Sequence, residues 1–308
     1  MMALVGADGT NGNPERRPSD RPLADRPLAD RVAVVTGASR GIGKGIALEL
    51  GAAGATVYVT ARTVDPGPIP GTIGETVAGI EALGGTAVGV ACDHHDDAAV
   101  ASLFEQVRGE TGRLDVLVNN VYSAIDLAPW LGKPFWEIPP DAWDQVIDIG
   151  VRSHYVASVL AAPMLLESGA GLIANISSSG SVQYAHNVLY GVGKAALDKM
   201  TADMAHDLDD RDVTVVSIWP GLVRTEIVEL GARRTDDGRA VLDLPGEGTF
   251  DLADAETPRF VGRGVVALAT DPDVGHRSGT AVTSLSLADD YGFTDLDGRV
   301  PRSTIRGD

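Results

Sequence analysis

Cysteine is almost absent from the sequence, since Cys92 is the only one among 308 residues. A lone cysteine cannot form an intramolecular disulfide, so a disulfide-stapled extracellular scaffold is excluded. Positive charge is also scarce: 25 Lys and Arg stand against 43 Asp and Glu, which gives a formal net charge of −18. Nucleic acids and anionic membranes attract basic surfaces, so neither is an expected partner.

Long apolar runs are missing as well. No run approaches the roughly 20 residues that a helix needs to span a bilayer, and the first 30 residues lack the basic-then-apolar pattern of a secretory signal. We therefore expect a cytoplasmic protein without a membrane segment. Residues 1–30 are rich in Pro and charge and repeat RPLAD in tandem, which predicts a disordered tail. Residues 301–308 are expected to form a second tail.

Between these tails, short apolar runs alternate with stretches of helical periodicity. The expected strands cover residues 32–36, 56–61, 86–93, 114–120, 171–178, 213–220 and 279–286, and the expected helices cover 42–54, 75–85, 98–110, 141–167, 189–209 and 258–270. Strands that are apolar throughout are buried on both faces, and their alternation with helices is typical of parallel sheets. The sequence thus predicts an α/β fold, a Rossmann-type doubly wound parallel sheet of seven strands in a single domain of residues 31–300.

One segment of this domain, residues 226–257, has little periodicity and much Gly, Asp and Arg. A loop of that length inside a compact domain is usually either functional or disordered. We interpret it as a lid over the substrate.

A glycine-rich turn, TGASRGIG at 36–43, separates the first strand from the first helix. Glycines let the backbone approach a pyrophosphate, and the helix N-terminus offers it unpaired N–H groups. Glycines also serve plain turns, but their place between strand and helix favours a dinucleotide site. The cofactor-binding residues expected here are Gly37, Ser39, Arg40, Gly41, Ile42 and Gly43.

The end of the second strand bears on which nicotinamide cofactor binds. An NAD enzyme of this layout places a carboxylate there for the ribose hydroxyl, whereas this chain has Ala61 followed by Arg62. A guanidinium suits a 2′-phosphate, and Arg40 can approach the same group. Asp65 is a rival carboxylate that comes four residues late. NADP(H) is therefore favoured over NAD(H).

Tyr190 and Lys194 are four residues apart at the start of a helix, which places both on one face. An ammonium beside a tyrosine lowers its pKa, so Tyr190 is a candidate proton donor to a carbonyl oxygen. Ser178 ends the fifth strand, at the sheet edge where ligands bind, and its hydroxyl is a candidate partner for the substrate oxygen. Chance spacing and ordinary turn chemistry are the alternatives for these three residues.

The ordered motifs TGxxxGIG, Asn119-Asn120, Ser178, Tyr190-xxx-Lys194 and Pro220-Gly221 resemble those of the short-chain dehydrogenase/reductase family, over about residues 31 to 300. NNVYSA (119–124), KPFWEIPP (133–140) and YGFTDLDGR (291–299) resemble the branch of dehydrogenase/reductase member 1. The resemblance implies NADP(H)-linked carbonyl reduction by a homodimer or homotetramer, with no metal.

The resemblance also implies residue roles. Tyr190 would be the acid/base and would also contact the cofactor. Lys194 would hold the nicotinamide ribose and lower the tyrosine pKa, and Ser178 would orient the substrate oxygen. The remaining cofactor-binding residues would be Asp93 at the adenine, Asn119 beside the cofactor, and Pro220, Gly221, Val223 and Thr225 near the nicotinamide.

Two departures from the family pattern stand out. Val121-Tyr122 replaces Ala-Gly after the asparagine pair, and Gly150 aligns with the family's fourth catalytic residue, an asparagine. In the family a relay water rests on that asparagine's main-chain carbonyl, which a glycine retains, so we expect the relay to survive. A strong rise of kcat in Gly150→Asn would show instead that it is impaired.

The expected substrate pocket is aromatic. Its candidates are Tyr122, Trp136, Tyr184, His186 and Leu222, with Trp130 and Phe135 nearby, and this bias indicates an apolar or cyclic carbonyl or alcohol. The alternative is that several of these aromatic residues only pack in the protein core. His94-His95 lies in an acidic turn that is interpreted as solvated rather than metal-binding. Two further functions stay open, an NAD-linked alcohol dehydrogenase and a non-catalytic NADP(H)-binding sensor.

Overall fold

The computed structural model describes residues 26–304, so most of the predicted N-terminal tail and the last four residues lie outside the described part. Seven parallel strands form one sheet in the order β10-β6-β5-β4-β1-β2-β3. They are β1 (Val32–Thr36), β2 (Thr56–Ala61), β3 (Thr86–Ala91), β4 (Val116–Asn119), β5 (Gly171–Ile176), β6 (Val213–Trp219) and β10 (Ala281–Thr283). The predicted doubly wound seven-stranded sheet is confirmed.

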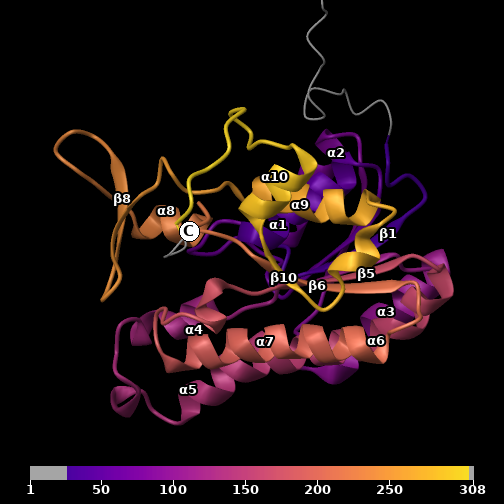
Figure 1. Ribbon diagram of the computed structural model, residues 1–308, viewed down its shortest axis with the longest axis horizontal. Coiled ribbons are helices and arrows are strands. Elements are labelled where there is room, and N and C mark those ends of the chain that lie inside the picture. The colour runs from indigo at the N-terminus through magenta and orange to yellow at the C-terminus, as the bar shows by residue number, and fades with distance from the viewer. Residues whose placement is uncertain (1–25, 305–308) are drawn as a thin grey trace, which may run out of the picture.

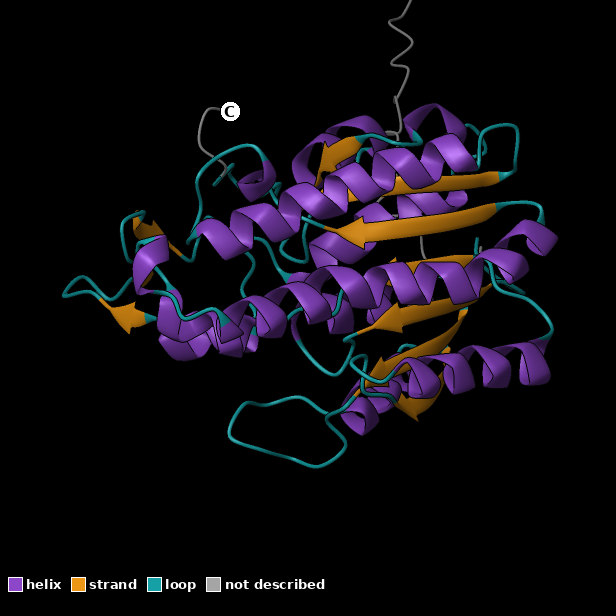
Figure 2. Ribbon diagram, turned by 90° about the horizontal axis from the view of Figure 1, so that it is seen from below, coloured by secondary structure: helices purple, strands orange, loops and turns teal. Residues whose placement is uncertain are grey.

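Strand order reverses at β1, which pairs with β2 on one side and β4 on the other. Val34, for example, lies beside Tyr58 of β2 and Leu117 of β4. Such a reversal opens a crevice at the carboxyl ends of the strands, where ligands of open α/β sheets bind. In Figure 2 the strands point toward the side of the molecule that carries the short antiparallel strands.

Helices cover both faces of the sheet (Figure 1). One layer contains α1 (Gly41–Ala52), α2 (Ile73–Ala82), α9 (Pro258–Thr270) and α10 (Ser284–Tyr291), and the other contains α3 (Asp97–Thr111), α6 (Ser153–Ser168) and α7 (Val188–Asp207). Each layer has its own buried apolar cluster against the sheet. The inner strands β6, β5, β4, β1 and β2 are buried along most of their length because each face packs against one of these clusters. The edge strands β3 and β10 contain no buried residue.

Two of the predicted boundaries differ in ways that change the assignment of a segment. Leu28, assigned to the tail, is only 1% exposed and joins the core beneath α1, with its N–H bonded to Ala53 O. The last strand ends at Thr283 rather than residue 286, because Thr283 caps the following helix α10 in a reciprocal capping box with Ser286. The run from 284 on is thus helical.

The long helix predicted over 141–167 is interrupted. It consists of α5 (Asp141–Trp143), a π-helical stretch (Asp144–Arg152) that contains Gly150, and α6. Within the described residues, the run Asp141–Ser168 has the length and composition of a membrane span, but half of its most apolar window is buried inside the protein, as in core helices. This run is therefore only weak evidence for a membrane-spanning helix.

The segment 226–257 is not an irregular loop, so that expectation was wrong. It folds into α8 (Glu226–Gly231) and a three-stranded antiparallel sheet of β7 (Arg233–Arg234), β8 (Ala240–Leu244) and β9 (Gly248–Asp251). Leu242 and Leu252 anchor it in a small apolar cluster with Leu222. Figure 1 shows α8 and β8 projecting from one end of the main sheet. We call β8, β9 and their turn the hairpin.

Candidate active site

A cavity of about 330 Å³ lies at the carboxyl ends of β1, β2, β3 and β4. Its walls are residues from six segments: 37–42, 61–63, 92–94, 120–124, Ile149 and 225–228. The first four of these segments directly follow strands of the central sheet. The cavity therefore occupies the crevice at the strand-order reversal, as a dinucleotide site of this fold does.

The glycine turn has the backbone shape that such a site needs. Gly37 and Gly41 adopt φ angles of 64° and 58°, which favour glycine. Gly43 does not line the cavity but packs behind the turn, where a Cβ atom would lie 2.5 Å from Gly37 O. The Asn120 side chain donates to Thr36 O and Gly37 O at 3.0 and 3.2 Å and so fixes the turn from the neighbouring strand.

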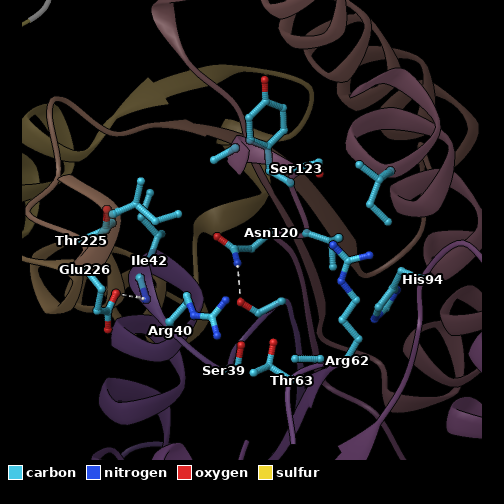
Figure 3. Close-up of a pocket in the computed structure, with 18 of the residues that line it drawn as sticks. Ser39, Arg40, Ile42, Arg62, Thr63, His94, Asn120, Ser123, Thr225 and Glu226 are labelled. Atoms are coloured by element: carbon cyan, nitrogen blue, oxygen red, sulfur yellow. Dashed lines mark hydrogen bonds between the residues drawn. The ribbon is translucent and has the colours of Figure 1, made fainter. Parts of the chain in front are cut away.

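A carboxylate occupies the N-terminus of α1. Glu226, the first residue of α8, accepts a 2.8 Å hydrogen bond from the Gly41 N–H, which Figure 3 marks with a dashed line. Helix N-terminal N–H groups attract anions. The Glu226 oxygen therefore stands in for a phosphate oxygen, and this observation shows that the turn fits a cofactor pyrophosphate.

The two arginines predicted at the 2′-phosphate are in different situations. Arg40 lines the cavity but also donates through Nε to Pro70 O at 3.0 Å and through Nη2 to Gly71 O at 2.8 Å. Arg62 is exposed, follows β2 directly and extends along the cavity wall opposite Thr225 and Glu226 (Figure 3). Arg62 is therefore the better placed of the two to meet a phosphate.

His94 and His95 differ, and the expectation of a solvated turn is wrong for His94. His94 lines the cavity, is 4% exposed and places Nε2 3.0 Å from Thr60 Oγ1. Burial lowers its pKa to about 4, so its ring is neutral at pH 7. His95 is exposed and bonds to Asp93, which also lines the cavity. No group of three metal-ligating side chains occurs within residues 26–304.

Ser178, Tyr190 and Lys194 come together at the start of α7. The side chains of Ser178 and Tyr190 hydrogen-bond to each other, and Ser178 Oγ also accepts from Gly180 N at 2.9 Å. Asn187 caps α7 by accepting from Tyr190 N at 3.1 Å, which fixes the first turn that carries the tyrosine. The structure therefore brings the three residues together, as the sequence predicted.

Their electrostatics differ from expectation. Burial raises the pKa of Tyr190, an effect that the Ser178 hydrogen bond partly offsets, whereas burial lowers the pKa of Lys194 to about 8. The predicted lowering of the Tyr190 pKa by Lys194 is not found. The reason is geometric, because Lys194 Nζ donates to Ile176 O at 3.0 Å and lies 5.7 Å from the Tyr190 ring centroid.

Several predicted cofactor residues lie behind the cavity wall. Asn119 is fully buried and donates to Ser158 Oγ and Asn175 Oδ1, both at 2.9 Å, so it braces the sheet, while Asn120 lines the cavity. Thr225 lines the cavity, whereas Pro220, Gly221 and Val223 do not.

Glu256, which the sequence did not single out, holds this loop from behind. Its Oε1 accepts from Gly221 N at 2.9 Å and from Ser284 Oγ at 2.6 Å, and its backbone forms a bridge with Val223. Oε2 is buried without a partner, and burial raises the pKa of Glu256 to about 7. The loop expected at the nicotinamide is therefore held by a buried carboxyl group that titrates near neutral pH.

The predicted substrate residues lie in three different places. Tyr122 and His186 pack edge-on against the Tyr190 ring, with centroids 5.9 and 4.5 Å away. Trp136 and Tyr184 are 73% and 69% exposed and line no part of the cavity, so their predicted substrate contact is unsupported. Leu222 packs in the apolar cluster under the hairpin.

Glu247, in the hairpin turn, is the second residue that sequence reasoning missed. Its Oε1 lies 2.7 Å from both the backbone N and Nδ1 of His186, and its charge raises the pKa of Tyr190. His186 itself adopts a φ of 59°, which is unusual outside glycine. The hairpin turn thus holds His186, whose ring packs against Tyr190, through a contact between residues 61 apart that no local pattern signals.

Comparisons with known proteins agree with this geometry. The family model of the short chain dehydrogenases matches residues 31–235. Dehydrogenase/reductase SDR family member 1 of Mus musculus is 46% identical over 276 residues, which cover 87% of this chain and 84% of that protein. The Homo sapiens protein of the same name is 47% identical over 273 residues, with the same coverage.

Solved structures with the same fold carry nicotinamide cofactors. A metagenomic short-chain oxidoreductase in complex with NADP is 31% identical, with a TM-score of 0.65 over 83% of this chain and 97% of that chain. A 7α-hydroxysteroid dehydrogenase in complex with NADH and 7-oxo glycochenodeoxycholic acid is 26% identical, with a TM-score of 0.67 over 84% and 94%. Both cofactors therefore occur among proteins similar to this chain.

Proposed function

The chain belongs to the short-chain dehydrogenase/reductase family, and from that premise we propose that it is an NADP(H)-dependent oxidoreductase. It reduces an apolar or cyclic carbonyl compound, with Tyr190 as the proton donor. The observation that carries the proposal is the cavity at the β1 switch point, with Arg62 on its wall and the Ser178–Tyr190–Lys194 group beyond it.

The preference for NADP(H) is supported by charge at the end of β2. Arg62 lines the cavity there, next to Ser39 and Thr63, whereas the rival Asp65 is exposed and does not line it. A guanidinium on this wall offers donors to a phosphate dianion. The ribose hydroxyls of NAD(H) would instead need an acceptor, and the wall at 61–63 supplies no carboxylate.

The chain's own residues manage the proton and the substrate oxygen. Bound NADPH would supply the hydride. Before substrate binds, Ser178 holds the Tyr190 hydroxyl by the hydrogen bond between them. When substrate binds, the single Ser178 proton turns to the carbonyl oxygen, and the Tyr190 hydroxyl is free to donate to the same oxygen. Tyr190, whose pKa burial keeps high, is protonated at neutral pH and delivers its proton to the oxygen as negative charge develops there. Lys194 remains largely cationic below its pKa of about 8. Its charge stabilises the resulting tyrosinate only weakly, because Nζ lies 5.7 Å from the ring centroid, and it does not bring the pKa of the resting tyrosine below its ordinary value.

The surroundings of Tyr190 support an apolar substrate. The rings of Tyr122 and His186 flank it, and the cluster beside it contains Leu127, Val146 and Leu189. Aromatic and aliphatic walls with few polar groups are typical of sites for apolar ligands. The hydroxysteroid dehydrogenase with the same fold was solved with a polycyclic ketone, which makes alicyclic ketones the first substrates to try.

The test is NADPH and NADH oxidation, followed by absorbance, against a panel of aromatic and alicyclic ketones and aldehydes. We expect turnover with NADPH and much weaker turnover with NADH. Equal use of the two cofactors would favour the NAD-linked alcohol dehydrogenase, and tight NADPH binding without turnover on any panel member would favour the sensor. The intact Ser178–Tyr190 hydrogen bond argues against a sensor.

We also propose that the protein works in the cytoplasm as a homodimer or homotetramer. Tyr155, Val159 and Leu166 of α6 and Val188 and Val192 of α7 are 41–55% exposed, which leaves apolar surface on the two longest α-helices. Light scattering coupled to size-exclusion chromatography tests the assembly, and a monomer of 32.0 kDa would contradict it.

A further inference from the structure

Tyr122 lies between the cofactor cavity and the catalytic group. It lines the cavity, yet its ring also contacts Lys194 and Tyr190, neither of which lines the cavity. Lys194 Nζ is 4.7 Å from the centre of the Tyr122 ring, closer than its 5.7 Å from the Tyr190 ring. The cation thus lies over the aromatic face, the arrangement in which a ring quadrupole attracts an ammonium.

The ring occupies its place because residue 150 is glycine. A Cβ atom on Gly150 would lie 3.1 Å from Tyr122 Cδ2 and 3.3 Å from Cε2, tighter than side chains normally pack. The ring is confined on its other sides, with Lys194 over its face and Tyr190 at 5.9 Å in an edge-on contact. The position of the aromatic ring at 122 therefore depends on the absence of a side chain at 150.

The Tyr122 hydroxyl makes no contribution that the structure reveals. It is one of the buried side-chain oxygens without a hydrogen-bond partner among residues 26–304. An unsatisfied buried hydroxyl costs stability, so any benefit of this residue has to come from its ring.

We propose that the Tyr122 ring is a positioning residue that holds the Lys194 ammonium beside Tyr190, in a space kept open by Gly150. The proposal rests on the proposed function, in which Lys194 stabilises the tyrosinate. The other groups that bear on the charge of Lys194 are Asp198, which favours the cation, and the neutral His154 across from it on α6. Neither replaces an aromatic face above Nζ.

A direct test measures the charge state of Lys194 without using activity. The chain has four lysines, so protein labelled with ¹³C at lysine Cε gives few signals, and Lys194→Met identifies the relevant one. We expect Tyr122→Phe to keep the Lys194 pKa near the wild-type value. Tyr122→Leu, which keeps the site apolar but removes the ring, should lower that pKa by about one unit, the size of a desolvated cation–π contact.

The Gly150 part is tested by a double-variant cycle. Alanine normally stabilises a helix relative to glycine, and Gly109→Ala on α3, where a Cβ atom would meet nothing within 4 Å, is the matched control. Gly109→Ala should raise Tm, whereas Gly150→Ala should not. In the wild-type background Gly150→Ala should also lower the Lys194 pKa. Both effects should disappear when Tyr122→Leu is also present, because the clash is then relieved.

The same variants give a kinetic signature. The basic limb of the kcat/KM profile for NADPH-dependent reduction should move down by about one pH unit in Tyr122→Leu and stay in place in Tyr122→Phe. An unchanged Lys194 pKa in Tyr122→Leu, or equal changes in the Leu and Phe variants, would overturn the proposal. If the wild type shows no turnover, the proposed function fails, while the NMR titration still decides the role of Tyr122.

Discussion

The two sides of the site are built differently. The cofactor side consists mainly of short segments that follow a strand of the sheet, such as the turn at 37–43 after β1 and Arg62 after β2, and the segment 225–228 closes it from a distant part of the chain. The catalytic side joins segments that are distant in sequence: His186 meets Glu247, Gly221 meets Glu256, and Leu222 N meets Thr304. The first side follows from local sequence, whereas the second depends on how the chain folds back on itself.

This contrast implies a division of labour. Changes on the cofactor side should alter which dinucleotide binds and how tightly, and changes on the catalytic side should alter kcat and its pH dependence. A substitution on the catalytic side that changes cofactor affinity would contradict this division. So would a substitution on the cofactor side that changes the pH dependence of kcat.

The largest expected effect is on the catalytic side. Tyr190→Phe removes the proton donor but keeps the ring that packs against Tyr122 and His186. Loss of general acid catalysis should lower kcat/KM by about 100- to 10,000-fold. Fluorescence titration with NADPH should show an unchanged Kd, and a parallel loss of binding would mean that the tyrosine also carries the cofactor.

Glu256 predicts a pH dependence of stability on the same side. Its pKa rises from 4.5 to about 7 on folding, so between these values the native state holds a proton that the unfolded chain releases. The free energy of unfolding should therefore fall as pH rises from about 4.5 to 7, by roughly 3 kcal/mol from this group. Urea unfolding at pH 5 and pH 8 should show that Glu256→Gln loses this difference. An identical pH dependence in both proteins would contradict it.

On the cofactor side, Arg62→Gln should weaken NADPH binding by about 10- to 100-fold, the worth of a charge-assisted phosphate contact. NADH lacks the 2′-phosphate and is the internal control, since its Kd should not change. Equal weakening of both dinucleotides would mean that Arg62 serves the shared part of the cofactor and that the preference for NADP(H) has another origin.

On both sides of the site, what the sequence predicted is geometry held within a single turn or helix. The turn at 36–43 and the Tyr190–Lys194 pair lie within single strand–helix units, where spacing alone fixes geometry. The burial of Leu28 and His94, and the contact of Glu247 with His186, depend on partners that no spacing rule identifies. The strand–helix boundary at Thr283 is set locally, by the capping box of Thr283 and Ser286.

Glu247→Gln should sharpen the contrast with a smaller effect. Glutamine retains an oxygen that can accept from the His186 backbone N–H but lacks the charge that raises the pKa of Tyr190. The Tyr190 pKa should fall, so the acidic limb for alcohol oxidation should move to lower pH, with a rate gain of a few-fold at neutral pH. Asp243→Asn, an exposed carboxylate of the same hairpin, is the matched control and should leave the limb unchanged.

The smallest effect is expected at Glu226, where α8 meets the glycine turn. Its carboxylate competes with phosphate for the Gly41 N–H, so Glu226→Gln should tighten NADPH binding by about 2- to 5-fold, the usual worth of a charge at a helix N-terminus. Glu229→Gln removes an equal charge from the same helix, where it pairs with Arg224, and should not tighten binding. Weaker binding in Glu226→Gln would show that the carboxylate helps to hold the cofactor.

Hydride transfer itself is the most direct test of the central claim. NADPH carrying deuterium at the transferred position of C4 would be incubated with an alicyclic ketone from the panel, and the alcohol product analysed by mass spectrometry. The account predicts one deuterium at the carbinol carbon with wild-type protein and almost no product with Tyr190→Phe. Product without deuterium, or equal labelling from deuterated NADH at the same concentration, would contradict an NADPH-dependent carbonyl reductase.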